Sequence, residues 1–551
     1  MKLYSRLIIG FIVSVLLSSA IAAGDLDKDY YKRLKKNWIY MQRVYEQINL
    51  HYVEEIDPAP LIKAGIDGML EQLDPYTVFI EDGDRRMRII TTGKYGGLGM
   101  EVGIRNNKVT IISPFENSPA KKAGILAGDI IEKIDGESIE NLRIEDVSKR
   151  LKGKVGTEVS LELTRPGISE PFTITLNRAE IVIKDVDYYA FIAPGIAYVS
   201  LSGFSDKAPS EMKRAIRELK NEGEIKAFII DLRGNPGGLL ESAVEIVNIF
   251  VDKGVQIVST RGFREGDVSF KTQHTPILPD VKLAVLVSGG SASASEIVAG
   301  ALQDLDRAVI IGEPTFGKGL VQKVYTIDKN TEARLKITTA KYYIPSGRCI
   351  QKEDYTRNNK AILTDTEINK NNKEFFTKNG RSFGNHGGIN PDVFVKGDST
   401  NYAIMQLMRT NFLFDFAVQY HNNHPVWSDT PAENDSIYLA FKDFLKEHDF
   451  KYEPEGSREI TEIEKLAEKK GFSESVSPIL EQLKAALQQE QHKELDYTVK
   501  SVKKYLRLEI AEKYYGSQGL KKYILGDDRQ AQQAIEILDN NRLYKSILKI
   551  K

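Results

Sequence analysis

The sequence predicts a multidomain protein in which an α/β core is joined to a small β domain and to helical regions at both ends. The chain has 551 residues, and at roughly 150 residues per domain this corresponds to three or four domains. Apolar strands alternate with amphipathic helices within residues 180–396, which is typical of an α/β core. Short strands punctuated by glycines precede this region, and helical periodicity with few strand signals follows it.

The overall composition excludes a strongly cationic protein. Lys and Arg together number 76 and Asp and Glu 77, so no positive excess is present that would hold a phosphate backbone. We therefore expect no nucleic acid as partner, and a protein or peptide instead. The single cysteine, Cys349, has no partner for an internal disulfide.

The N-terminus has the pattern of an export signal. Lys2 and Arg6 precede the apolar stretch 7–17, and the small residues that follow suit cleavage after Ala22. The apolar stretch is short for a membrane span. We expect a signal peptide over 1–22 and an exported, periplasmic protein; a retained membrane anchor is the alternative.

Residues 25–90 are predicted to be helical. Apolar and aromatic side chains recur at helical spacing over 29–53, and a second helix is expected over 60–73. Such helices either pack on the rest of the chain or join the subunits of a homo-oligomer, and the sequence leaves both open.

A glycine-rich loop opens the β region, which we place at 91–179. The run KYGGLGMEVGI begins at 94, and a turn of this kind presents several backbone N–H groups to one anion. Strands, a short helix at 119–123 and a helix at 144–151 follow in an order that resembles a PDZ domain. An ordinary small β domain whose glycines only serve turns is the alternative.

PDZ domains add the C-terminal strand of a partner to their own sheet edge, and their glycine loop holds the terminal carboxylate. The resemblance implies that Gly97, Leu98 and Gly99 form this loop here. It also implies that Val147 and Leu151 line the pocket for the last side chain of the partner.

Two strand ends in the α/β region carry the residues of greatest chemical interest. The run AFIIDLRGNPGG at 227–238 is a buried strand that ends in a glycine turn. The run VSGGSASASEIVAG at 287–300 leads from a strand through small residues into a helix, and Ser293 lies where that helix begins. Groups at the carboxyl ends of strands in such sheets meet at one crevice.

Ser293 and Lys318 form the candidate catalytic pair of a serine peptidase. A serine hydroxyl needs a base to take its proton, and a lysine amine serves only when a dry environment keeps it neutral. The apolar neighbours Phe316, Leu320 and Val321 favour such an environment.

Two further functions belong to this candidate site. The side chain of Gln322 is placed to hold the lysine amine by a hydrogen bond. A tetrahedral intermediate needs N–H donors, and the backbone of Gly237 or Gly238 together with that of Ala294 is expected to supply them.

These segments resemble the carboxy-terminal processing peptidases, also called tail-specific proteases. The motifs that carry the resemblance occur in one order along the chain, from LDPYT at 73 through DLRGNPGG at 231, SASASEIVAGALQD at 291, GEPTFGKGLVQ at 312 and KYYIPSGRCIQ at 341 to GGINPD at 387. The resemblance places the nucleophile at Ser293, the general base at Lys318 and the supporting glutamine at Gln322.

The resemblance also implies a ClpP/crotonase-like peptidase core, which we place at 180–396 with a polar insertion at 352–386. It implies cleavage of flexible proteins near their free C-termini, with no cofactor. Family members often carry an arginine before the glycine that follows the PDZ helix, whereas this chain has Lys152 there. Lysine keeps the positive charge of arginine but cannot form its two parallel hydrogen bonds. The sequence therefore does not decide whether binding of a substrate tail to the PDZ domain activates this protein.

Several other interpretations compete with this one. A PDZ scaffold or chaperone-like binder with an inactive peptidase core is the main alternative. The hydroxyls of Ser291 and Ser295 lie close to the nucleophile in sequence, and helix capping is their expected function. The GEPTFGKG run imitates a phosphate-binding loop, but Gly319 stands where a hydroxyl residue would hold magnesium.

The histidines and the last third of the chain add little chemistry. None of the seven histidines lies in a catalytic motif, and no second ligand pair accompanies His421 and His424, so no metal is expected. Residues 397–551 are predicted to be an all-helical domain that is absent from a minimal family core. This domain is a solvated appendage, a subunit contact or a binding surface for an adaptor protein.

Overall fold

The computed structural model describes residues 28–81, 89–328, 330–352, 355–356, 360–361, 374–384, 387–397, 401–424, 426–453 and 455–550. The chain separates into two compact units. Unit 1 takes Met1–Arg86, Lys253–Gln273 and Gly317–Ile389, and unit 2 takes Met87–Asp252, His274–Phe316 and Asn390–Lys551. The predicted signal peptide and most of the predicted polar insertion lie outside the described residues.

A six-stranded sheet forms the centre of unit 2. Its strand order is β10-β11-β12-β15-β16-β23, in which β10 and β11 are antiparallel and the other neighbours are parallel. The runs of apolar residues in these strands suit parallel strands that are buried on both faces. The bounds are β10 (Val186–Ala193), β11 (Ile196–Leu201), β12 (Ala227–Asp231), β15 (Lys282–Val287), β16 (Val309–Gly312) and β23 (Val393–Phe394).

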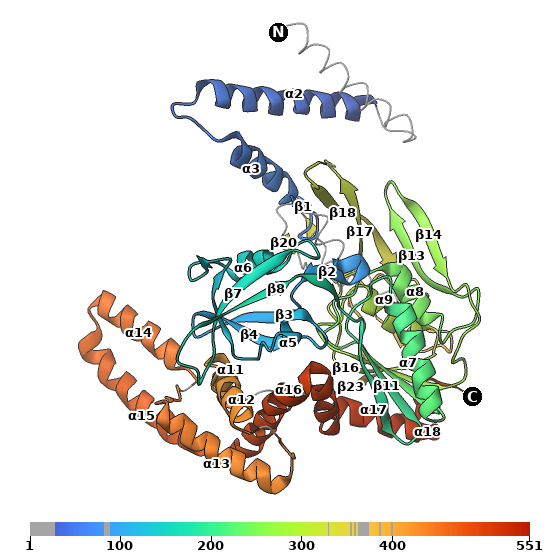
Figure 1. Cartoon of the computed structure of the whole chain (residues 1–551). Coiled ribbons are helices and arrows are strands. Elements are labelled where there is room, and N and C mark those ends of the chain that lie inside the picture. Colours follow the sequence, from blue (N-terminus) through green and yellow to red (C-terminus); the bar gives the residue numbers. More distant parts are fainter. Residues whose placement is uncertain are drawn as a thin grey trace. The chain divides into compact units, whose positions relative to one another are not determined.

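Helices cover both faces of this sheet. The helices α7 (Ala208–Glu222), α8 (Leu240–Val247) and α9 (Ala294–Asp304) lie on one face (Figure 1). The last two helices, α17 (Arg529–Asp539) and α18 (Asn541–Ile547), pack on the other face through an apolar cluster with the strands. The C-terminal end of the chain therefore completes the core of the central sheet.

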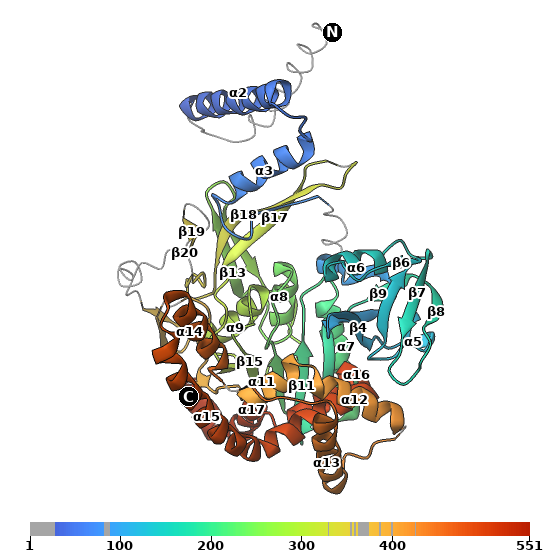
Figure 2. The same cartoon turned by 90° about the vertical axis from the view of Figure 1, so that its left-hand side faces the viewer.

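The β region of unit 2 is a compact domain of its own (Figure 2). Its sheet has the order β3-β4-β5-β7-β8, with β6 paired to β5, and β2 pairs with β9 in a separate ribbon. The predicted helix at 144–151 is confirmed. The bounds are β2 (Lys94–Gly97), β3 (Met100–Arg105), β4 (Lys108–Pro114), α5 (Pro119–Lys122), β5 (Ile130–Ile134), β6 (Glu137–Ser138), α6 (Ile144–Leu151), β7 (Glu158–Thr164), β8 (Phe172–Asn177) and β9 (Ala179–Val182).

The remaining helices of unit 2 confirm the helical character predicted for the last third of the chain. Their shared core is rich in aromatic side chains, among them Phe416, Trp427 and Phe441. The long helix α16 is interrupted at Gly516, where the backbone is not helical. The bounds are α11 (Tyr402–Arg409), α12 (Phe412–Asn423), α13 (Pro431–Glu447), α14 (Ser457–Lys470), α15 (Ser473–Tyr497) and α16 (Val499–Gly526).

Unit 1 joins the N-terminal helices to a second sheet that the sequence did not predict. The helices α2 (Lys28–His51) and α3 (Pro58–Leu70) confirm the predicted helical region. The sheet has the order β1-β18-β13-β14, and β17 also pairs with β18. No helix among the described residues combines the length and the apolar character that a membrane span requires.

Three strands of unit 1, β1, β13 and β17, are antiparallel partners of the long strand β18. The bounds are β1 (Val78–Ile80), β13 (Gln256–Gly262), β14 (Gly266–Lys271), β17 (Leu320–Thr326), β18 (Arg334–Tyr343), β19 (Tyr355–Thr356), β20 (Lys360–Ala361), β21 (Phe375–Phe376) and β22 (Ser382–Phe383). Since β17 follows Lys318 directly, the pairing of β17 with β18 fixes the backbone that carries this lysine.

Candidate active site

Ser293 lies at a strained turn between β15 and α9. Its φ is 57° and its ψ is −114°, and it caps the N-terminus of α9. Residues other than glycine rarely adopt a positive φ, and such strain concentrates at functional sites. The backbone N–H of Ser293 donates to Oε2 of Glu296 at 2.8 Å, so the side chain of the helix's first turn holds the strained residue in place.

Glu296 is fully buried, and its carboxylate accepts a second hydrogen bond in addition to the one from the N–H of Ser293. Its Oε1 accepts a hydrogen bond from Oγ1 of Thr315 at 2.6 Å. Buried carboxylates are costly unless donors satisfy them, and the two donors here come from the serine turn and from the segment after β16. Sequence analysis did not single out Glu296, although its position three residues after Ser293 is that of a capping box.

The glycine turn after β12 is bonded to the serine turn through Asn235. The side-chain amide of Asn235 donates to the carbonyl of Leu201 at 2.6 Å, and its Oδ1 accepts from the N–H of Gly237 at 2.9 Å. Its own backbone carbonyl accepts from the N–H of Ala292 at 3.0 Å. The two turns therefore form one hydrogen-bonded assembly within unit 2.

Only a glycine fits at position 237. A Cβ there would lie 2.8 Å from the Cβ of Ser293 and from the backbone nitrogen of Ala294, and φ is +97°. Because Gly237 donates its N–H to Asn235, Gly238 and Ala294 remain as the candidate oxyanion donors. Ala294 is the first residue of α9, where helical N–H groups have no partner within the helix.

Ser291 and Ser295 have structural functions. Both side chains are fully buried. The hydroxyl of Ser291 donates to the carbonyl of Leu232 at 2.7 Å, and that of Ser295 donates to the carbonyl of Asn235 at 2.9 Å. Both hydroxyls brace the glycine turn, a function that replaces the expected helix capping.

Lys318 lies in unit 1, immediately before β17. Its Nζ is 4.5 Å from the centroid of the Tyr76 ring, and its carbonyl accepts a hydrogen bond from the Tyr342 hydroxyl. The next residue, Gly319, donates its N–H to Oε1 of Gln351 at 2.7 Å. Backbone and side-chain contacts thus fix the loop on both sides of the lysine.

Tyr76 belongs to the LDPYT motif, to which sequence analysis gave no function. Asp74 organises the motif by accepting hydrogen bonds from the N–H of Tyr76 at 3.0 Å and from the hydroxyl of Thr77 at 2.8 Å. It also accepts from the hydroxyl of Thr338 on β18 at 3.0 Å. The motif therefore attaches Tyr76 to the same sheet that carries Lys318.

The surroundings of Lys318 are less apolar than the sequence indicated. Leu320 is buried and Val321 is half-buried. Phe316 is 50% exposed. It lies at the end of a different unit, and its N–H donates to the carbonyl of Ser291.

Gln322 lies on β17 at an irregularity in the pairing with β18. Its Nε2 is buried and makes no hydrogen bond among the described residues, and the same holds for Oγ1 of Thr339 on the facing strand. The register shifts between Val321 and Gln322, so Thr339 has no direct partner. Bulges and unpaired buried polar groups are both frequent beside active sites.

The candidate peptide-binding residues lie together in the β domain. Gly97 ends β2, Gly99 has a φ of +73°, and Leu98 between them is buried in the same apolar cluster as Val147 and Leu151. The loop and the helix α6 therefore share one core.

Lys152 ends α6 and lies beside the glycine loop. Its Nζ is 5.2 Å from the centroid of the Tyr95 ring, and burial raises the pKa of Tyr95 to about 12. The N–H of Gly153 donates to the carbonyl of Gly96 at 3.0 Å. The end of the helix is thereby bonded to the strand that leads into the loop.

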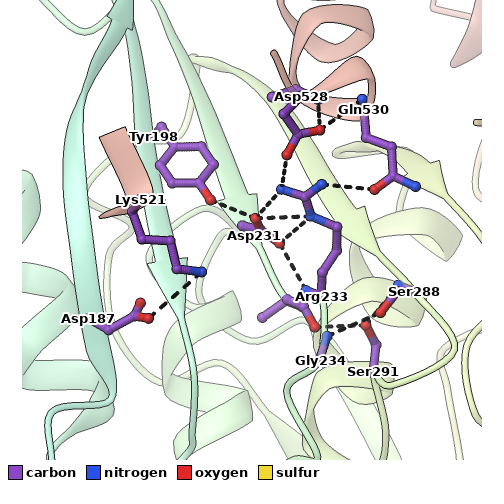
Figure 3. Close-up of polar contacts among 12 residues, drawn as sticks. Asp187, Tyr198, Asp231, Arg233, Gly234, Ser288, Ser291, Lys521, Asp528 and Gln530 are labelled. Atoms are coloured by element: carbon purple, nitrogen blue, oxygen red, sulfur yellow. Dashed lines mark hydrogen bonds and ion pairs between the residues drawn. The ribbon is translucent and has the colours of Figure 1, made fainter. Parts of the chain in front are cut away.

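An ion cluster lies behind the glycine turn (Figure 3). Burial by itself would raise the pKa of Asp231, but the charge and hydrogen bonds of Arg233, with a hydrogen bond from Tyr198, outweigh it and lower that pKa. The hydroxyl of Tyr198 donates to Oδ2 of Asp231 at 2.6 Å. No group of three or more potential metal ligands occurs among the residues that the structure describes.

Comparison with known families matches four segments of the chain in order. The model described as Peptidase family S41 matches residues 195–361, and the PDZ domain model matches 111–165. The model of the activating protease CtpB N-terminal domain matches 18–83. A fourth, described as the C-terminal helical domain of a probable PDZ-protease, matches 403–538.

Individual relatives are similar over most of the same region. The carboxy-terminal-processing protease of Bartonella bacilliformis is 38% identical over 63% of this chain and 80% of its own length. The carboxy-terminal processing protease CtpB of Bacillus subtilis is 35% identical over 61% of this chain and 68% of its own length. A solved structure titled photosystem II D1 C-terminal processing protease is 27% identical, covers 64% of this chain and 92% of its own, and has a TM-score of 0.33. The identity over four fifths of the Bartonella protein, together with the peptidase and PDZ matches, shows that the chain belongs to the carboxy-terminal processing proteases of peptidase family S41, which are serine-type peptidases.

Proposed function

We propose that the protein is an exported serine endopeptidase that engages the C-terminal tails of proteins through its PDZ domain. In this proposal it cleaves peptide bonds through an acyl-enzyme formed on Ser293, with Lys318 as the base. The observation that carries the proposal is the strained turn of Ser293, which is hydrogen-bonded to the glycine turn through the N–H of Ala292 and the carbonyl of Asn235.

The reaction begins when neutral Lys318 takes the hydroxyl proton of Ser293 and Oγ attacks the scissile carbonyl carbon. The N–H groups of Gly238 and Ala294 stabilise the oxyanion that forms, and loss of one such donor costs about 3 kcal/mol. Lys318 then gives the proton to the leaving amine. Water attacks the acyl-enzyme with Lys318 again as base, which releases the new C-terminus and the free serine.

Gln322 supports the lysine in this proposal. Its Nε2 is buried without a hydrogen-bond partner among the residues that the structure describes. A buried unpaired donor costs about 1–3 kcal/mol, so its retention needs a functional reason. Its position four residues after Lys318, on the strand that this lysine precedes, suits a hydrogen bond that forms with the lysine or with the substrate during turnover.

The PDZ loop is proposed to hold the substrate carboxylate. Backbone N–H groups of Gly97, Leu98 and Gly99 would bind the anion, and Val147 and Leu151 would contact the last side chain. A homologous processing protease and a PDZ match support a peptide ligand. The signal peptide is part of the same proposal, and mass spectrometry of the secreted protein should find Ala23 as its first residue.

Oligomer formation through the N-terminal helices is also proposed. No residue of α2 is buried, and Leu34, Trp38 and Val44 are each more than half exposed. The C-terminal helices are the other proposed contact for a subunit or an adaptor protein.

The test compares Ser293→Ala with Ser291→Ala on an unfolded substrate that ends in a free carboxylate. The first variant should lose cleavage and retain bound substrate, whereas the second should still cleave, at a reduced rate, because its hydroxyl braces the turn without taking part in the chemistry. Continued cleavage by Ser293→Ala would remove the nucleophile from the proposal. Tight binding without cleavage by the unmodified protein would favour a scaffold or chaperone-like binder.

A further inference from the structure

Arg233 is the second residue after β12 and leads directly into the glycine turn. Its guanidinium makes contacts in two directions (Figure 3). On its own strand, Nε donates to Asp231 at 2.9 Å and a terminal nitrogen donates to the same carboxylate at 2.6 Å. In the other direction, it reaches the N-terminus of α17, which lies almost three hundred positions further along the chain.

Asp528 provides one of the contacts from α17, and it has two functions. As the N-cap residue, its Oδ1 accepts the N–H groups of Gln530 at 3.0 Å and of Ala531 at 3.1 Å. Its Oδ2 lies 2.6 Å from a terminal nitrogen of Arg233. One carboxylate thus starts the helix and binds the arginine at the same time.

Gln530 provides the second contact. Its Oε1 accepts from the other terminal nitrogen of Arg233 at 2.9 Å, and its Nε2 donates to the carbonyl of Val395 at 2.7 Å. The side chain is 3% exposed. Both ends of the amide are therefore bonded, which fixes its orientation toward the arginine.

The consequence for the turn follows from the backbone contacts of its first residues. The N–H of Arg233 donates to Oδ1 of Asp231 at 2.9 Å, and the N–H of Gly234 donates to Oγ of Ser288 at 3.1 Å. A Cβ on Gly290 would lie 2.9 Å from the Cα of Gly234. The chain at 233–234 is thus closely packed against the loop that carries Ser293, and a shift of Arg233 moves both.

We propose that Asp528 and Gln530 are positioning residues for proteolysis, which hold Arg233 and thereby fix the turn that presents the N–H of Gly238 to the oxyanion. This inference rests on the proposed function of that turn. Charge-assisted hydrogen bonds from a planar, five-donor guanidinium are strong and directional, so they suit such a brace. The C-terminal helical region then takes part in catalysis through a contact that a minimal family core lacks.

The packing of α17 does not depend on this contact. Ala534, Ile537 and Leu538 bury the helix against the strands of the central sheet. A substitution that changes only the Asp528 oxygen facing Arg233 therefore tests the positioning of Arg233 without disturbing the packing of α17.

The experiment uses the full-length protein with Asp528→Asn. Asparagine caps a helix as well as aspartate does, so the cap remains while an amide group replaces the charge that faces Arg233. We expect kcat to fall about tenfold to hundredfold, as for the loss of a hydrogen bond between charged groups, with KM unchanged. Hydrogen exchange at the amides of 232–238 should become at least several-fold faster.

Asp429→Asn is the matched control. Asp429 lies in the same helical region, is 15% exposed and pairs with Nε of Arg507 at 3.0 Å, without contact to the glycine turn. We expect its kcat and the exchange of 232–238 to match those of the unmodified protein. Equal losses in the two variants, or unchanged kcat and exchange in Asp528→Asn, would overturn the inference.

Ser293→Ala separates this inference from the proposed function. If Ser293→Ala abolishes cleavage while Asp528→Asn leaves kcat unchanged, the positioning function is wrong and the nucleophile stands. If Ser293→Ala still cleaves, the turn has lost its proposed catalytic function, and the inference falls with it.

Discussion

The turn that carries Ser293 and the loop that carries Lys318 are held in different ways. Around the serine, carboxylate, amide and hydroxyl groups are buried and hydrogen-bonded to one another, from Glu296 to Asn235. The side chain of Lys318 is half-buried, and on the strands β17 and β18 the atoms Nε2 of Gln322 and Oγ1 of Thr339 are buried and have no hydrogen-bond partner among the described residues. The buried polar groups of the serine turn are thus hydrogen-bonded to one another, whereas two buried polar atoms of the sheet that carries Lys318 have no partner among the described residues.

The contact of Lys318 with Tyr76 sharpens this difference. An amine over an aromatic face is stabilised in its charged form by about 0.5–1 kcal/mol. A general base must be neutral, so the contact opposes the proposed catalytic state.

The largest expected effect comes from Lys318→Arg. Arginine keeps the charge and the contact with Tyr76 but does not lose its proton, so kcat should fall by about 10²–10⁴-fold, the usual contribution of a general base. Lys323→Arg is the control, since Lys323 only pairs with Glu265 at the surface. Steady-state cleavage of an unfolded substrate measures both, and wild-type kcat in Lys318→Arg would exclude a lysine base.

Glu296→Gln tests whether the serine turn depends on its buried carboxylate. The amide keeps the shape but offers one acceptor where two donors, the N–H of Ser293 and the hydroxyl of Thr315, now bind. We expect a loss of about 1–3 kcal/mol in the free energy of unfolding, since one buried donor is left unpaired. Urea unfolding and kcat are measured together; a stable, fully active variant would contradict the fixed geometry.

A pH titration tests the ion cluster on the serine side. The pKa of Asp231 is lowered below its ordinary value of 3.8, so the folded state releases this proton more readily than the unfolded state. Its contribution to stability is therefore present above that ordinary value and is lost as pH falls through the folded pKa. The free energy of unfolding should decrease on acidification below 3.8, by at most about 1.4 kcal/mol per pH unit for one proton.

Asp231→Asn is the comparison for this titration. Its unfolding free energy should be lower at neutral pH and depend less on pH in the acid range. Parallel titration curves for the two proteins would show that Asp231 makes no such contribution.

The smallest effect is expected from Gln322→Met on the lysine side. Removal of a buried donor without a partner should raise the free energy of unfolding by about 1 kcal/mol, while kcat falls. Gln256→Met is the control, because Oε1 of Gln256 already accepts a hydrogen bond from Ser269. A destabilised Gln322→Met protein would show that the Gln322 amide makes hydrogen bonds in solution. The difference in hydrogen bonding between the serine turn and the lysine loop would then be smaller.

The sequence by itself determined the elements and the order of the motifs. Hydrophobic periodicity predicted α6 to the residue, because this helix has one apolar face and a clear end. The turn at Gly237 was predicted from the two glycines that end the apolar run at 227–238. Helix ends and turns of this kind depend on residues that are neighbours in the sequence, so they can be predicted without knowledge of the tertiary structure.

Tertiary structure alone decided which distant groups meet. The pairing of Arg233 with Asp528, the joining of the LDPYT segment to β18 and the grouping of Lys318 with the N-terminal helices in unit 1 bring together residues far apart in the chain. Such contacts depend on how sheets and helices pack, because buried charges and donors find partners wherever the folded core places them, and no local pattern records that choice.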